Sequence, residues 1–165
     1  MKRKFLIALS MLVCMSTFTL GLTACGSDDE PNNKTMTQQF TVQGKFIYQD
    51  GTFVGGYPGA ADPNGKEFLF YNAIYEEVKE IIKAQVWDVS FKPDEKDQKI
   101  KEQNAVAEQR FTTMVKALEA VQKKLDQADK NTYKCHFGMK IELKAVGEKE
   151  IRSGQVTLSY AGNED

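Results

Sequence analysis

The chain has 165 residues, with 22 basic and 23 acidic side chains and a formal net charge of −1. Its first 24 residues hold three basic residues and no acidic one, so 19 basic and 23 acidic residues follow, a net −4. Domains that bind nucleic acid present a basic patch to the phosphates, and surfaces that lie on anionic lipid are also basic. The charge balance favours neither function.

The first 24 residues have the composition of a secretory signal peptide. Lys2, Arg3 and Lys4 form a basic start, and a largely apolar run follows over residues 5–20. That run is shorter than the ~20 apolar residues that a membrane-spanning helix needs, and it contains serine and threonine. We therefore expect residues 1–24 to direct export and then to be removed.

The signal segment ends at a cysteine. Leu22-Thr23-Ala24-Cys25 resembles the lipobox of bacterial lipoproteins. This resemblance implies that a diacylglycerol is joined to the Cys25 thiol and that the peptide is cut just before it. The alternative is an ordinary signal peptide cleaved after Ala24, with Cys25 unmodified. Cys14 lies inside the apolar run and is less suitable for lipidation.

A short acidic cluster follows the cysteine and contains Ser27, Asp28, Asp29 and Glu30. It resembles the export signal of surface lipoproteins in the Bacteroidota. The resemblance implies a chain anchored in the outer membrane through Cys25 and displayed on the cell surface, or otherwise held at the periplasmic face. The alternative is a solvated, charged spacer. Residues 25–38 as a whole are polar and aperiodic, which predicts a flexible tether.

Residues 39–165 are long enough to form one domain with an apolar core. The chain has three cysteines. Once Cys14 is removed and Cys25 carries lipid, Cys135 has no partner within the chain, so no disulfide is expected.

The first part of this domain predicts a strand and a helix. Phe40, Val42, Phe46 and Tyr48 alternate with polar residues, as in a half-buried strand, and Gly44 is a possible bulge. Apolar residues at helical spacing predict a helix over residues 66–85, with Asn64 and Glu67 forming a capping box. Residues 86–91 fit either a short strand or the packed end of that helix.

The second part predicts a long helix and a β-hairpin. The helix spans residues 94–128, but residues 94–105 are almost entirely polar and are expected to project from the core or fray. Strict alternation over residues 132–145 predicts a strand, and residues 147–149 a turn. Residues 151–160 return as its partner, with a bulge near Ser153-Gly154. The expected fold is an α+β two-layer sandwich, with an antiparallel sheet of three or four strands and two helices on one face.

Residues 49–66 contain five glycines and two prolines and are expected to form a long loop. The loop carries Phe53 and Tyr57. Exposed aromatic side chains on a loop can contact a sugar or a protein partner, whereas in many proteins they pack back onto the core. Phe53 and Tyr57 are therefore the candidate binding residues.

No catalytic or metal-binding pattern emerges from the remaining residues. Cys135 and His136 are adjacent in a strand, so their side chains point to opposite faces and cannot act as a pair. One histidine and one core cysteine do not make a zinc site. Asp62, Asn64 and Glu67 lack the spacing of a calcium loop. We expect no metal and no cofactor.

These observations predict a non-enzymatic, lipid-anchored envelope module that binds an unknown protein or glycan, or that has a structural role. The candidate surfaces are the loop over residues 51–65 and the polar half of the second helix. The alternative is a protease inhibitor or a small hydrolase that uses two facing carboxylates.

Overall fold

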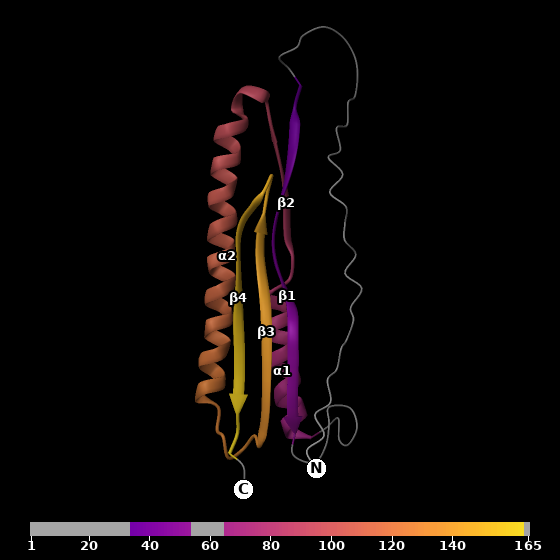
Figure 1. Ribbon diagram of the computed structural model, residues 1–165, viewed down its shortest axis with the longest axis vertical. Coiled ribbons are helices and arrows are strands. Elements are labelled where there is room, and N and C mark those ends of the chain that lie inside the picture. The colour runs from indigo at the N-terminus through magenta and orange to yellow at the C-terminus, as the bar shows by residue number, and fades with distance from the viewer. Residues whose placement is uncertain (1–33, 54–64, 164–165) are drawn as a thin grey trace.

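One antiparallel sheet with two helices on one face forms the part of the chain that the computed structural model describes, residues 34–53 and 65–163 (Figure 1). The sheet order is β2-β1-β3-β4, with strands β1 (Met36–Phe53), β2 (Gln85–Phe91), β3 (Cys135–Val146) and β4 (Glu150–Ala161). The helices are α1 (Lys66–Ile81) and α2 (Lys96–Gln127), and a 3₁₀ turn, η1 (Pro93–Glu95), precedes α2. The predicted α+β two-layer sandwich is confirmed.

The central strand β1 has 18 residues and is about 60 Å long. Its first part, residues 36–42, pairs with β2, and residues 41–53 pair with β3. Because Met36 already pairs with Phe91, residues 36–38 belong to the sheet and not to the tether expected over residues 25–38. Their polar sequence does not indicate a strand, because the strand that pairs with them, β2, lies more than 50 residues later in the chain.

Residues 86–91, for which the sequence allowed either a short strand or the end of a helix, have regular structure. Residues 86–91 are a strand, β2, and α1 ends at Ile81 rather than at residue 85. The N-cap of α1 is Gly65, without a side-chain cap, so the expected capping box is absent, and Asn64 lies outside the described residues.

The expected fraying of residues 94–105 is wrong. Helix α2 is regular from Lys96, has 32 residues and spans about 48 Å, close to the length of the sheet. Its polar first half bonds to the β3–β4 turn and to β2: Lys96 Nζ lies 2.8 Å from Glu148 Oε1, and Trp87 Nε1 donates to Gln103 Oε1 at 2.9 Å.

Two β-bulges lie at positions other than those expected. In β1 the extra residue is Ile47, not Gly44, because Phe46 pairs with Ile141 while Tyr48 pairs with Lys140. The first bulge leaves two large side chains exposed, Ile47 at 42% and Tyr48 at 47%.

The second bulge lies in β4 at Ile151, not at Ser153-Gly154. Arg152 pairs with Ala145 and Glu150 pairs with Val146, so Ile151 is the extra residue. Ile151 packs partly buried against the core, which accounts for its opposite parity in the sequence.

The core lies between the sheet and the helices. Alternate β3 residues are fully or almost fully buried on the inner face, and the intervening residues are partly exposed on the outer face. The inner face packs against Phe111, Met114, Leu118, Val121 and Leu125 of α2 and Ile74 and Val78 of α1. Within the described ranges, no helix or strand covers the outer face (Figure 1).

Gly44 lets the end of α1 approach the sheet backbone. Its N–H donates to the carbonyl of Ile82 at 2.9 Å. A Cβ atom at position 44 would lie 2.6 Å from Leu143 Cδ2 and 2.8 Å from Ile82 Cβ. The glycine is needed here for close packing.

We predict that Gly44→Ala lowers the free energy of unfolding by about 1–3 kcal/mol, because the methyl group overpacks this contact. Urea unfolding followed by circular dichroism measures the change. Gly154→Ala is the matched control, since its Cβ would only touch Phe111 Cζ at 3.4 Å. Equal losses for the two variants would show that close packing at position 44 is not the reason for the glycine.

Candidate functional site

A shallow hollow of about 290 Å³ lies on the outer face of the sheet, toward the end where β1 finishes. Gly138 of β3 forms part of its floor and pairs with Asp50 of β1 on one side and Ser159 of β4 on the other. The hollow exists because position 138 has no side chain between these two. Its full lining is Asp50, Gly51, His136, Phe137, Gly138, Ser159 and Tyr160.

Asp50, in one wall of the hollow, is bonded to Tyr48, which lies beside the lining and is not part of it. Tyr48 Oη donates to Asp50 Oδ2 at 2.7 Å, and this hydrogen bond raises the pKa of the Tyr48 phenol. A Cβ atom at Gly138 would lie 3.1 Å from Asp50 Oδ1, so the carboxylate lies beside the floor of the hollow. The pair fixes an exposed aromatic ring next to a hydrogen-bond acceptor.

The opposite wall is held by helix α2. The Ser159 N–H donates to Gln122 Oε1 at 2.9 Å, and Gln122 Nε2 donates to the Ser159 carbonyl at 3.0 Å. A side-chain amide thus bonds both backbone groups of Ser159 and closes this part of the β4 edge. The wall therefore keeps its position relative to the core.

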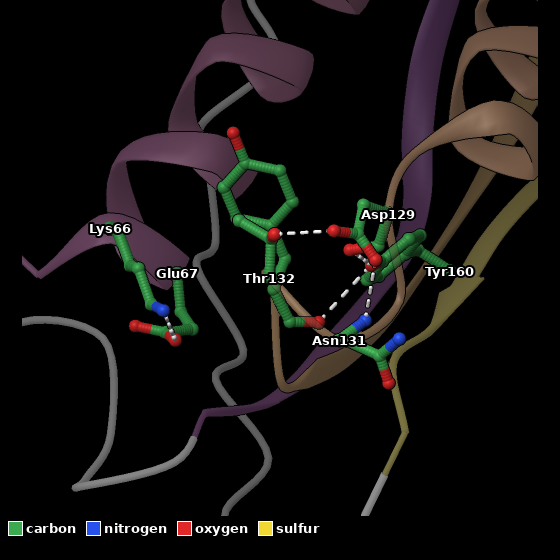
Figure 2. Close-up of polar contacts among 7 residues, drawn as sticks. Lys66, Glu67, Asp129, Asn131, Thr132 and Tyr160 are labelled. Carbon is green, nitrogen blue, oxygen red and sulfur yellow. Dashed lines mark hydrogen bonds and ion pairs between the residues drawn. The ribbon is translucent and has the colours of Figure 1, made fainter.

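A turn after α2 closes the same end of the molecule (Figure 2). The Asp129 carboxylate accepts hydrogen bonds from the Thr132 hydroxyl at 2.6 Å and the Asn131 N–H at 2.9 Å. The bond from Thr132, and then that from Asn131, lowers the pKa of Asp129. Tyr160 Oη lies within hydrogen-bond distance of the Asp129 and Tyr133 carbonyls, which ties the turn to β4.

An aromatic cluster supports the hollow from the inner face. Phe70 of α1 stacks on Tyr133 with ring centroids 4.1 Å apart, and it meets Tyr160 edge-on at 5.0 Å. Phe137 stacks on Tyr160 at 5.5 Å. Since Phe137 and Tyr160 also line the hollow, its floor is part of the core.

The lysines of the outer face lie further along the sheet. Lys45 Nζ bonds Glu142 Oε2 at 2.9 Å, and Lys144 Nζ lies 3.8 Å from the same oxygen. The hydrogen bond from Lys45 is the main cause of the lowered pKa of Glu142. The single carboxylate of Glu142 thus balances one of these two lysine charges, and one positive charge remains. Lys140, which pairs with Tyr48, is the lysine nearest in register to the hollow.

The residues expected from sequence to bind a partner are placed only in part. Phe53 is the last residue of β1, where its backbone pairs with Cys135, so the expected loop begins after it. Tyr57 lies outside the described residues, as do Cys25 and the cluster of Ser27, Asp28, Asp29 and Glu30. Phe53 follows Asp50 by three residues, so β1 ends beside the hollow.

The expected placement of Cys135 and His136 on opposite faces is confirmed. Cys135 has no exposed surface, and burial raises the pKa of its thiol to about 11, with a smaller effect from the charge of Glu67. His136 lies in the lining of the hollow. This site was not predicted from the sequence. The feature that could have indicated it is Gly138, a glycine in a row of β3 residues whose side chains point to the outer face.

The described part of the chain offers no cluster for a metal: within residues 34–53 and 65–163, no group of three or more His, Cys, Asp or Glu residues could hold one. In the same two ranges, no helix is long and apolar enough to cross a membrane. Among the described residues that line the hollow, Asp50 is the one carboxylate. The lining therefore offers hydrogen-bonding groups, because the rings of Phe137 and Tyr160 are buried in the core.

Comparisons with known proteins place the chain in no family. No family model and no curated protein matches the sequence, and no solved structure matches the fold.

We predict that Cys135 is inert in the folded protein. With a pKa near 11 instead of 9.0, its thiolate at pH 8 is about 100-fold less populated than that of an ordinary cysteine. Alkylation by iodoacetamide, followed by mass spectrometry of the peptide that contains Cys135, should be at least about 100-fold slower than in the urea-unfolded chain. Similar rates in the two states would contradict the buried placement of the thiol.

Proposed function

We propose that the chain is a non-enzymatic lipoprotein, anchored to the outer membrane by a lipid on Cys25 and displayed on the cell surface. Its folded domain binds a partner through the hollow around Gly138. The observation that carries the anchor is the lipobox-like sequence Leu22-Thr23-Ala24-Cys25, directly followed by the acidic cluster. The hollow is the candidate for binding because exposed polar and aromatic groups border it.

The position of the hollow supports its use as a binding site. Ten residues, 26–35, separate Cys25 from β1, so their contour length limits the distance between the two to about 40 Å. From Met36 to Asp50, β1 then extends about 46 Å. An anchor on Cys25 thus places the start of β1 near the membrane, and the hollow at the far end of the domain is open to a partner.

We favour binding over hydrolysis because a two-carboxylate mechanism needs acids about 5–10 Å apart in one cleft. Among the described lining residues, Asp50 supplies one carboxylate, and it is bonded to Tyr48.

We predict that the N-terminal peptide of the purified protein begins at Cys25 and carries a diacylglycerol thioether, as mass spectrometry would show. Cys25→Ala should move the protein out of the membrane fraction. Cys14→Ala, the matched control inside the signal segment, should leave it there. An unmodified sulfur at Cys25, or an intact leader, would rule out the anchor.

We also predict that the two ends of the domain lie at different heights above the membrane. Single cysteines are introduced at Asp94, in the turn near the start of β1, or at Lys130, in the turn after α2, and are labelled with a fluorophore. Both positions are exposed, and buried Cys135 should stay unlabelled.

In vesicles that carry a headgroup quencher, the label at Asp94→Cys should be quenched more strongly than the label at Lys130→Cys. Equal quenching, or stronger quenching at position 130, would contradict the proposed orientation.

A further inference from the structure

We propose that the hollow around Gly138 binds the ring of a neutral sugar in a glycan chain, with the Tyr48 side chain as its platform. The inference rests on the proposed function, since it names the ligand class of the same site.

The shape suits a sugar ring within an extended chain. Asp50, Gly138 and Ser159 lie in one row across three adjacent strands, so the two walls stand about 10 Å apart. Sites for small, compact ligands enclose most of the ligand surface. This hollow is shallow and open to solvent, so it can contact one ring of a longer chain without enclosing it.

The apolar border of the site is Tyr48, which the β1 bulge exposes and which lies next to the lining residue Asp50. Tyr48 is 47% exposed, and Ile47 beside it is 42% exposed. Exposed aromatic rings with a polar tip serve surfaces that contact partly apolar, partly wet ligands. A sugar ring is such a ligand, because its C–H groups form an apolar face while its hydroxyl groups point outward.

The polar groups match hydroxyl groups rather than an ion. Asp50 offers carboxylate oxygens as acceptors, and the Ser159 hydroxyl can both donate and accept. Among the described lining residues there is no lysine or arginine to bind an anion, and no group of three or more metal-ligating side chains to bind a metal cation. Hydroxyl groups, which donate and accept, fit this mixture.

The site is built before the ligand arrives. The Tyr48–Asp50 hydrogen bond fixes one wall, and Gln122 fixes the backbone of Ser159 in the other. The floor residues Phe137 and Tyr160 belong to the packed core. A weak, shallow contact benefits from such rigidity, because little conformational freedom is lost on binding.

The test uses the purified full-length protein in detergent micelles and soluble neutral oligosaccharides of glucose, mannose, galactose or xylose. Saturation-transfer NMR should show magnetisation passing from the protein to the ring C–H protons of at least one of them. Titration of that signal gives a dissociation constant. No transfer from the native protein to any of the four would overturn the proposal.

Two variants then test the location. Tyr48→Ala should weaken binding about tenfold by removing the platform. Gly138→Ala should weaken it at least as much, since the new methyl group fills the floor and presses on Asp50 Oδ1. Alanine suits a strand better than glycine, so this variant should remain folded. Circular dichroism checks both variants.

Gln43→Ala, on an exposed residue of β1 beyond the bulge, is the matched control and should bind as the native protein does. Binding that persists unchanged in both Tyr48→Ala and Gly138→Ala would place the sugar elsewhere and overturn the assignment. The lipid on Cys25 is measured separately by mass spectrometry, so a failed sugar assay and a missing anchor are distinguishable.

Discussion

The structure depends on the pairing of one strand, β1, along its whole length. Its first residues need β2 as a partner and its last residues need β3, so neither partner alone would order all of it. Helix α1 rises from the far end and stops at Gly44, close to where β2 takes over. The long helix α2 then lies along both regions, contacting the sheet from Lys96 at one end to Gln122 at the other (Figure 1).

The parts of this fold that were predictable from sequence are those whose burial follows a local period. Strand β3 alternates strictly because its inner side chains face the helices and its outer side chains do not. The apolar stripe of α2 from Ala107 to Leu125 is equally regular. Such patterns record which face of an element is buried, and they needed no knowledge of the partner.

The parts that were missed depend on partners far away in the chain. Residues 36–38 look like a tether because their order comes from β2, and residues 94–105 look frayed because Trp87 and Glu148 supply their contacts. The bulge at Ile47 was missed for the same reason, since a bulge is defined by the register of two strands. Local composition contains none of this information.

The hollow shows how the register between β1 and β3 determines which side chains face solvent together. Tyr48 and Asp50 share the outer face with Gly138 because the extra residue at Ile47 shifts the pairing by one. With the parity that begins at Phe40 continued, Tyr48 would have pointed inward and Gln49 outward. The sequence therefore placed Tyr48 in the core, and the candidate residues were sought in the following loop. A single inserted residue instead turns an aromatic side chain and a carboxylate to solvent, beside a glycine in an otherwise regular sheet.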